Sequence, residues 1–265
     1  MSSQVELFGR FRSGEKEFVG KTDGSEVIEM DTSRMTDVIA DRARLTGRTH
    51  RVDDLRILAP VDKPGKIVCI GLNYRSHITE MEWETPSAPI IFSKPASAVI
   101  GQGDDIVLPA MSGRVDYEGE SALILGKRAR CISNGADAIF GFTCFNDVTA
   151  RDLQKGDPDW TRAKGFDTFA PMGPFISQSA PSRVRTRLNG REVQNAEMSD
   201  RVFDDAAIVE YISRIMTLEP GDVIATGTPS GISPMKVGDI VEVELDGIGT
   251  LMNSVTSGEP NIEGR

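Results

Sequence analysis

The 265-residue sequence predicts a β-rich α+β fold, and three observations support this prediction. Short apolar runs bounded by Gly, Pro, Asn or Asp outnumber the segments with helical periodicity. The dipeptides Asn189-Gly190 and Asp246-Gly247 favour the positive φ angles that tight hairpins need. Strands and helices do not alternate regularly, so the pattern fits neither a Rossmann fold nor a TIM barrel.

The N-terminal segment is polar and interrupted, and it predicts a small α/β domain over residues 1–62. Strands are expected at Val5–Arg12 and Glu17–Lys21, on either side of a Ser-Gly turn. A helix is expected at Thr32–Leu45, with Asp31 or Thr32 as its cap. The two prolines Pro60 and Pro64 mark the boundary to the next domain.

The second domain is predicted to span residues 63–257, followed by a tail at 258–265. Its expected strands are Ile67–Ile70, Pro89–Phe92, Ile106–Leu108, Tyr117–Leu125, Ile139–Phe145 and Asp222–Ala225, with hairpins over Val184–Val193 and Val241–Met252. One helix is clear, because Ile208, Tyr211, Ile212 and Ile215 repeat at helical spacing. Asp204 or Asp205 would cap this helix, and Pro220 would end it. The final Ile262-Glu263-Gly264-Arg265 is either a protease-cleavage tag or native sequence.

The composition limits the classes of function. The formal charge is −10, and no Lys or Arg cluster offers the basic face that nucleic acid or an anionic membrane requires. There is no apolar signal core and no run of membrane-spanning length. The three cysteines, Cys69, Cys131 and Cys144, form no CxxC pair, which favours free buried thiols in a reducing compartment. We therefore expect a soluble, cytoplasmic protein without nucleic-acid or membrane partners.

Two groups of carboxylates suggest a metal site. On a strand, Glu118 and Glu120 point to the same face, where they repel unless one is protonated or a cation lies between them. Asp147 directly follows an apolar strand and would supply a third oxygen ligand. The alternatives are a solvent-facing strand edge for the glutamates and a turn-capping role for Asp147. Two histidines are too few for a multi-histidine zinc site, so Mg²⁺ is expected, with Mn²⁺ or Ca²⁺ possible.

Four further residues could take part in chemistry. His77 and Glu80 share a face if their segment is helical, and a carboxylate beside an imidazole favours water activation; the alternative is an exposed pair without a role. The loop that follows, with Trp83, could move as a lid. Lys164 could stabilise an oxyanion, and Thr228 could bind a carboxylate; the alternatives are a solvated surface lysine and a plain loop. His50 has no such partner and is expected on the solvated surface.

Taken together, six motifs in order resemble the fumarylacetoacetate hydrolase family, in its short bacterial and archaeal form. They cover roughly residues 66–255 and are Gly71-Leu-Asn-Tyr-Arg-Ser-His-Ile-Thr-Glu80, Phe92-Ser-Lys-Pro95, Asp116-Tyr-Glu-Gly-Glu120, Asn146-Asp-Val-Thr-Ala-Arg-Asp-Leu-Gln154, Lys164-Gly-Phe-Asp-Thr-Phe169 and Pro220-Gly-Asp-Val-Ile-Ala-Thr-Gly-Thr-Pro229. The resemblance implies a mixed β-roll or barrel core and a homodimer. Gly119 departs from the family pattern, which has a larger side chain there, and would loosen the strand without removing the metal.

The resemblance also implies roles for individual residues. It implies metal binding by Glu118, Glu120 and Asp147, catalysis by His77, Glu80 and Lys164, and substrate binding by Tyr74, Lys94, Gln154 and Thr228. These roles favour Mg²⁺-dependent hydrolysis of a C–C bond in a small β-diketo acid of the acylpyruvate or fumarylpyruvate type. Within the family, the alternatives are an oxaloacetate decarboxylase or tautomerase and the 2-hydroxyhepta-2,4-diene-1,7-dioate isomerase/decarboxylase of aromatic catabolism. From a different class, the chain could be a non-catalytic binding protein stabilised by metal.

Overall fold

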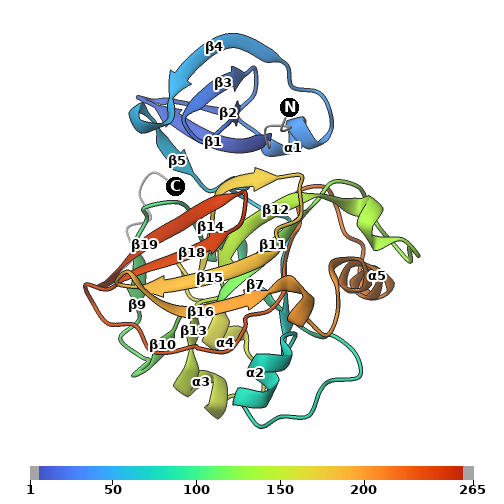
Figure 1. Cartoon of the computed structure of the whole chain (residues 1–265), viewed down its shortest axis with the longest axis vertical. Helices are drawn as coiled ribbons and strands as arrows, with labels where there is room; N and C mark the ends of the chain where they lie inside the picture. Colours follow the sequence, from blue (N-terminus) through green and yellow to red (C-terminus); the bar gives the residue numbers. More distant parts are fainter. Residues whose placement is uncertain (1–5, 259–265) are drawn as a thin grey trace.

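Antiparallel strands at the N-terminus extend a sheet that continues into the rest of the chain (Figure 1). In this computed structural model, which describes residues 6–258, the N-terminal part contains β1 (Leu7–Ser13), β2 (Lys16–Thr22), β3 (Glu26–Met30), α1 (Met35–Ile39), β4 (Leu45–Arg51) and β5 (Arg56–Leu58). Strand β1 pairs with β2 and β5 and also with β14 of the second part, through Leu7 opposite Ser177 and Phe8 opposite Ile176. The N-terminal strands are therefore joined to the main sheet by hydrogen bonds.

The helix predicted at Thr32–Leu45 is wrong in length, because only Met35–Ile39 is helical. Asp41 follows with a φ of 54°, which ends the helix. The chain then extends, and the Asp31 amide donates to the Arg44 carbonyl at 2.9 Å. Pairing of β4 with β3 thus outweighs the local helical pattern.

The second part is built on a long mixed sheet. Its members are β6 (Ile67–Gly71), β7 (Ile90–Lys94), β8 (Val99–Ile100), β11 (Gly119–Leu125), β12 (Ile139–Asn146), β14 (Ala170–Ser177) and β17 (Val223–Ala225). The sheet order runs β4-β3-β2-β1-β14-β12-β11-β17-β6-β7, so two separate edges remain and no barrel closes within residues 6–258. Strands β6 and β17 are parallel, although more than 150 residues separate them in the sequence.

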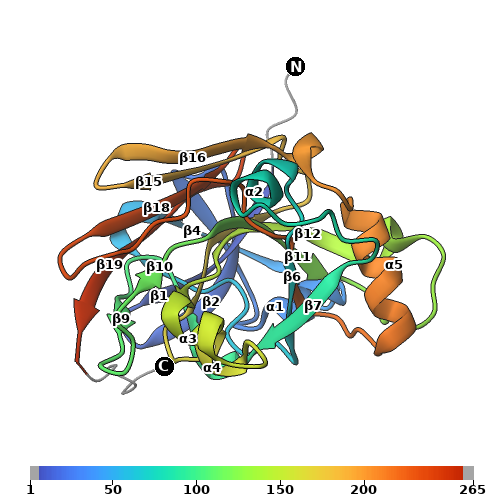
Figure 2. The same cartoon turned by 90° about the horizontal axis from the view of Figure 1, so that it is seen from below.

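A second sheet lies across this one and encloses the core (Figure 2). It consists of β9 (Ile106–Leu108), β15 (Arg183–Leu188), β16 (Arg191–Glu197), β18 (Ile240–Leu245) and β19 (Gly249–Ser257). Both predicted hairpins are confirmed, the first with Asn189 and Gly190 at φ angles of 54° and 76°. Apolar side chains of the two sheets, such as Leu123 and Val243, share one buried cluster.

Short helices and a two-stranded ribbon complete the second part. They are α2 (Arg75–Glu80), α3 (Arg151–Gly156), α4 (Thr161–Lys164), α5 (Asp205–Ile215), β10 (Val115–Asp116) and β13 (Thr149–Ala150). Asp204 caps α5 by accepting a hydrogen bond from the Ala207 amide at 2.8 Å, as predicted, although the helix ends at Ile215, before Pro220. The strand-rich α+β class is confirmed. No helix of residues 6–258 is both long and apolar enough to cross a membrane.

Three sequence predictions about single residues or short segments are corrected. The strand predicted at Tyr117–Leu125 is shorter than expected, because β10 ends at Asp116 and β11 begins only at Gly119. His50 is not a solvated residue without a partner, since its Nε2 lies 3.1 Å from buried Glu29 and its ring lies 4.9 Å from that of Phe18. Cys131 is exposed, whereas Cys69 and Cys144 are buried thiols as expected.

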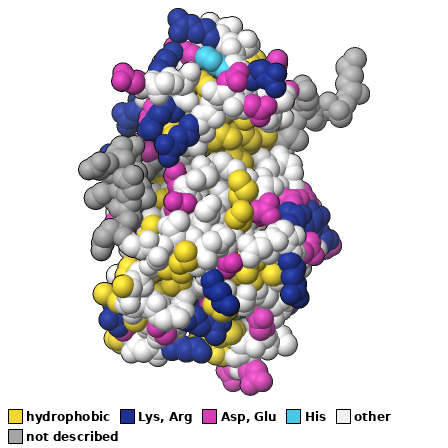
Figure 3. All heavy atoms as spheres, turned by 90° about the vertical axis from the view of Figure 1, so that its left-hand side faces the viewer, with side chains coloured by type: hydrophobic (Ala, Val, Ile, Leu, Met, Phe, Trp, Pro, Cys, Tyr) yellow, Lys and Arg dark blue, Asp and Glu magenta, His cyan; other side chains and the backbone are white. Residues whose placement is uncertain are grey.

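Charged side chains of both signs are interspersed on the face shown in Figure 3. Many form ion pairs, such as Lys16 on β2 with Glu29 on β3 at 2.6 Å and Arg56 on β5 with Asp104 in the loop before β9 at 2.7 Å. The exposed pairs of this kind add little to stability. The charges that bear on function are instead buried in the second part of the chain.

Candidate functional site

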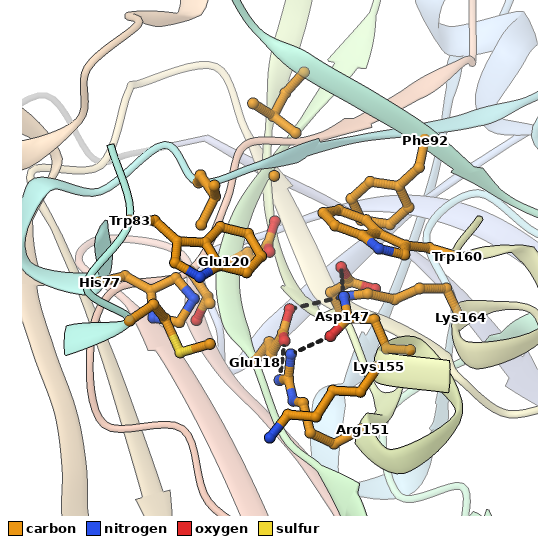
Figure 4. A pocket seen from close by; sticks show the side chains of 16 residues that line it. His77, Trp83, Phe92, Glu118, Glu120, Asp147, Arg151, Lys155, Trp160 and Lys164 are labelled. Atoms are coloured by element: carbon orange, nitrogen blue, oxygen red, sulfur yellow. Dashed lines mark hydrogen bonds and ion pairs between the residues drawn. The ribbon is translucent and has the colours of Figure 1, made fainter. Parts of the chain in front are cut away.

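A cavity of about 330 Å³ opens between α2, α3, α4 and the loop after β17 (Figure 4). Its lining combines charged and polar groups with large apolar side chains. Its lining is Ile70, Gly71, Leu72, His77, Met81, Trp83, Phe92, Glu118, Glu120, Asp147, Arg151, Gln154, Lys155, Trp160, Lys164 and Thr228. Seven of the ten residues proposed from the sequence belong to this lining.

Three carboxylates converge on the floor of the cavity. Ligand oxygens of Glu118, Glu120 and Asp147 all lie within 4.8 Å of one another, and the three residues are at most 5% exposed. Pairing of β11 with β12 brings them together, because Gly119 lies opposite Asn146. The Asp147 amide donates to the Glu118 carbonyl at 2.8 Å, which fixes the two acidic residues side by side.

Buried cations neutralise part of this charge. Lys164 Nζ donates to Glu118 Oε2 at 2.8 Å and to Asp147 Oδ2 at 2.6 Å, and Arg151 Nη2 contacts Glu118 Oε1. Burial opposes ionisation of Glu118, but Lys164 and Arg151 outweigh it and hold the pKa of this carboxyl well below its usual range. Burial would lower the pKa of Lys164, but the charges of Asp147 and Glu118 outweigh burial, and the pKa is raised. These groups are therefore ionised in the folded protein.

Glu120 lacks such a counter-charge. Its Oε2 accepts only from the Gly227 amide, at 2.8 Å, among the interactions found in residues 6–258. Burial first, and then the charges of Asp147 and Glu118, raise the pKa of Glu120 well above its ordinary value. A hard cation among the three carboxylates would relieve this repulsion, and an all-oxygen donor set suits such a cation. The residues present thus fit a divalent metal ion.

His77 and Glu80 lie on α2 and form the expected pair at the side of the cavity. His77 Nδ1 lies 3.1 Å from Glu80 Oε2, and His77 is buried. Glu80 is held in place from the other side, because the Gly231 amide donates to Glu80 Oε1 at 3.0 Å. A carboxylate on Nδ1 leaves Nε2 of the imidazole as the atom that can face a water molecule or substrate.

Thr228 lines the cavity within a network that sequence reasoning missed. Its hydroxyl donates to the Gly119 carbonyl at 3.0 Å and accepts from Gln194 Nε2 at 2.9 Å, while Gln194 Oε1 accepts from the Gly119 amide at 3.0 Å. Gln194 comes from the distant β15–β16 hairpin, so no local motif signals it. The expected contact of Thr228 with a substrate carboxylate would have to replace its bond to Gly119.

The other predicted substrate-binding residues differ in position. Gln154 lines the cavity, and its Oε1 accepts from Arg151 Nη1 at 2.6 Å. Lys94 lies behind the carboxylates, fully buried, with Nζ 2.5 Å from Asp147 Oδ1 and 3.0 Å from the Val148 carbonyl. Tyr74 points away, since its hydroxyl contacts Met198 Sδ at 3.3 Å. The structure therefore brings Gln154 to the cavity, but neither Lys94 nor Tyr74.

Arg151 and Asp116 are functional candidates that the sequence prediction omitted. Arg151 Nε donates to Asp116 Oδ2 at 2.9 Å, and Asp116 is fully buried. Asp116 therefore orients the guanidinium that contacts Glu118. The signal available in the sequence was the i, i+3 spacing of Arg151 and Gln154 at the start of a helix.

Comparison with known proteins agrees with this geometry. Residues 66–256 match the model of the fumarylacetoacetate (FAA) hydrolase C-terminal domain, and residues 7–60 match the Rv2993c-like N-terminal model. The chain belongs to the fumarylacetoacetate hydrolase family. The family resemblance deduced from the six motifs is thus confirmed.

Relatives within the fumarylacetoacetate hydrolase family carry several activities. The mitochondrial oxaloacetate tautomerase fahd2 of Xenopus laevis is 39% identical over 249 residues, covering 87% of this chain and 77% of that protein. The 2-hydroxyhepta-2,4-diene-1,7-dioate isomerase of Mycobacterium marinum is 38% identical, with a TM-score of 0.85 and coverage of 98% of this chain and 100% of that one. A maleylpyruvate hydrolase from Sphingobium sp. SYK-6, solved with manganese(II) ion and pyruvate, is 28% identical, with a TM-score of 0.79 and coverage of 96% and 100%. The chain is accordingly an enzyme of this family rather than a non-catalytic binding protein.

Proposed function

We propose that the chain is a divalent-metal-dependent hydrolase that cleaves a C–C bond in small β-diketo acids of the acylpyruvate type. One observation carries the proposal, namely that three buried carboxylates line the same cavity as His77, which is paired with Glu80. Mg²⁺, or Mn²⁺ in its place, would be held by Glu118, Glu120 and Asp147 and would supply Lewis-acid chemistry toward a 2-oxo acid. The maleylpyruvate hydrolase described above with manganese and pyruvate supports both the metal and the substrate class.

The residues of the chain divide the remaining work. His77, oriented by Glu80, would take a proton from water as the water attacks the distal carbonyl of the substrate. The bond between the two carbonyl-bearing halves then breaks, its electron pair leaves as the enolate of pyruvate, and that carbon takes up a proton. Lys164 has three N–H donors and uses two of them on carboxylates, so one remains for a substrate oxygen. Gln154, with Arg151 on one side, would fix the orientation of the substrate.

A second candidate is an oxaloacetate tautomerase, which moves a proton without adding water. The 39% identity to a tautomerase over most of the chain favours this candidate. The same carboxylates and lysine would serve both reactions, since each passes through an enolate. The two reactions differ in whether His77 and Glu80 must activate water.

Turnover of acetylpyruvate and of oxaloacetate, followed by absorbance with and without Mg²⁺ or Mn²⁺, tests the proposal. We expect metal-dependent loss of acetylpyruvate, with acetate and pyruvate as products, and its abolition in Glu118→Ala. The His77→Ala variant should lose at least about 100-fold in hydrolysis, because a general base contributes that much, while its Mg²⁺ affinity stays near that of the wild type. His50→Ala, which removes the other histidine, is the matched control and should hydrolyse normally.

The outcomes separate the candidates. Enolisation of oxaloacetate without cleavage of acetylpyruvate would assign the tautomerase, and Mg²⁺ affinity that falls in His77→Ala would contradict the division between ligands and base. We also propose a cytoplasmic homodimer, in line with the family resemblance. Sedimentation of the purified protein measures the oligomeric state, and a monomer would contradict it.

A further inference from the structure

We propose that the cavity selects 2-oxo acids whose distal group is flat and apolar, and that Trp160 and Trp83 hold this group. The inference rests on the proposed function for the 2-oxo acid end of the substrate and adds the chemistry of the other end. Both tryptophans of the chain line this one cavity. In Figure 4 the two indoles lie on either side of the opening, with Trp83 near His77 and Trp160 near Lys164.

The cavity combines a cluster of charged groups with a large apolar surface. The carboxylates, Lys164 and Arg151 occupy one end, where a 2-oxo acid would bind. Large apolar side chains make up much of the remaining lining, contributed by Ile70, Leu72, Met81, Trp83, Phe92 and Trp160. The two parts meet where Lys164 Nζ lies 4.9 Å from the centre of the Phe92 ring. A substrate that fits both ends therefore carries its charge at one end and an apolar group at the other.

Trp160 is held in a fixed position as a binding wall. Its ring meets that of Phe92 edge-on, with centroids 5.0 Å apart and an interplanar angle of 71°. Behind it lies Gly71, where an added Cβ would come within 2.9 Å of Trp160 Cζ3. The glycine thus leaves the space that the indole fills.

The position of Trp160 is also tied to the reactive end of the site. The Lys164 amide donates to the Trp160 carbonyl at 3.0 Å, one turn away on α4. Lys164 Nζ lies 4.9 Å from the centre of the Phe92 ring, which packs against Trp160. A ligand ring on Trp160 and a substrate oxygen on Lys164 would therefore be positioned by the same short helix.

Trp83 supplies the other side of the opening. It follows α2, with its amide donating to the Ile78 carbonyl at 3.1 Å, and its side chain is 49% exposed. A large half-exposed aromatic side chain at the mouth of a cavity is costly in water and gains contacts when an apolar group binds. A ligand with an apolar distal group would cover this exposed ring.

A second carboxylate on the substrate would find few partners here. The guanidinium of Arg151 is bonded to Asp116, Glu118 and Gln154. Lys155 is the remaining basic group of the lining, and it is exposed, so its attraction for a carboxylate is screened by water. The described residues therefore favour an apolar distal group over an anionic one.

Isothermal titration calorimetry of the Mg²⁺-loaded protein tests the inference with ligands that cannot be hydrolysed. The ligands are pyruvate, which has no distal group, 2-oxo-4-phenylbutanoate, which carries a ring, and 2-oxoglutarate, which carries a carboxylate. We expect the phenyl compound to bind about tenfold more tightly than pyruvate, and 2-oxoglutarate to gain no comparable advantage.

Variants assign the preference to particular side chains. Trp160→Ala should reduce the ratio of the affinity for 2-oxo-4-phenylbutanoate to that for pyruvate to about threefold or less. Gly71→Ala should reduce this ratio in part, because it displaces the indole. Trp83→Ala, at an exposed position that does not threaten folding, should weaken the phenyl compound but not pyruvate. Lys155→Met is the matched control and should leave the preference unchanged.

Each outcome decides between the inference and the proposed function. Pyruvate binding that needs Mg²⁺, together with equal affinities for all three ligands, would overturn the inference and leave the proposed function standing. Tighter binding of 2-oxoglutarate that is lost in Lys155→Met would replace the apolar group by a carboxylate. Failure of every ligand to bind the Mg²⁺-loaded protein would overturn both.

Discussion

Replacement of Gly119 by alanine tests how closely the carboxylate-bearing strand packs against the second sheet. A Cβ at this position would lie 2.0 Å from Thr186 Oγ1 and 3.1 Å from Gln194 Oε1. The first distance is about 1.4 Å short of the 3.4 Å at which ordinary van der Waals contact begins. The prediction that Gly119 loosens the strand is therefore wrong. The glycine instead allows β15 to approach the strand closely.

The expected cost follows from this overlap. An extra methyl group in a packed core costs about 1–3 kcal/mol, which lowers the melting temperature of a protein of this size by roughly 2–12 °C. Gly119 lies between two of the proposed metal ligands, so Mg²⁺ affinity should fall as well, by about tenfold for 1.4 kcal/mol of displaced strand. Thermal unfolding and calorimetric Mg²⁺ titration measure the two effects.

A second substitution separates this explanation from a general loss of folding. Thr186 Oγ1 is buried and makes no hydrogen bond within residues 6–258, so Thr186→Ala should cost little by itself and should restore stability and Mg²⁺ affinity to Gly119→Ala. Thr186→Val retains a branched side chain and should not restore them. Rescue by valine as complete as rescue by alanine, or a Gly119→Ala variant that melts like the wild type, would refute the steric argument.

Three further predictions concern single groups. Burial and the neighbouring carboxylates raise the pKa of Glu120 above its ordinary value of 4.5. The neutral side chain therefore stabilises the metal-free protein at a pH below 4.5, and this contribution is lost as the pH rises through the pKa of the folded state. In EDTA, the melting temperature should therefore decline with rising pH in the wild type and decline less in Glu120→Gln, while Mg²⁺ should stabilise the protein most at high pH. Equal declines in the two proteins would contradict this. Tyr74→Phe should keep kcat/KM within about twofold, because the hydroxyl faces Met198, and a larger loss would restore Tyr74 as a substrate contact. The hydrogen bond from Lys16 lowers the pKa of Glu29. Glu29→Gln should therefore reduce the free energy of unfolding by about 1–2 kcal/mol above pH 4.5 and by progressively less below it, without a change in turnover. A loss of stability that persists at low pH would contradict the ion-pair origin.

The carboxylate cluster was predictable from the sequence because its members lie at or next to the ends of two strands that pair with each other. Glu118 and Glu120 are two residues apart, and Asp147 follows the strand that pairs with theirs, so strand pairing alone brings the three together. The His77–Glu80 pair was predictable for a similar reason, since both belong to one helical turn. Local spacing determined these parts of the site.

Features that depend on contacts between distant segments were not predictable. The segment after Ile39 has a helical pattern, but the chain turns at Asp41, and a strand that pairs with β3 begins at Leu45. Gln194 lies on a hairpin and bonds to Gly119, which is 75 residues away in the sequence. Lys94 belongs to a family motif, yet the direction of its side chain on β7 places it behind Asp147. Motifs indicate which residues matter, whereas tertiary packing decides which face they serve.

The pairing of β1 with β14 ties the first residues of the chain to the stability of its enzymatic part. Without β1, the backbone amides and carbonyls of β14 near Ser177 would lose their partners, and an uncovered strand edge invites pairing with other molecules. Phe8 would also be withdrawn from the main apolar cluster, where it accompanies Met172 and Ile176. The N-terminal strands thus cover this edge of the main sheet, and an attempt to prepare the second part alone would begin by redesigning that edge.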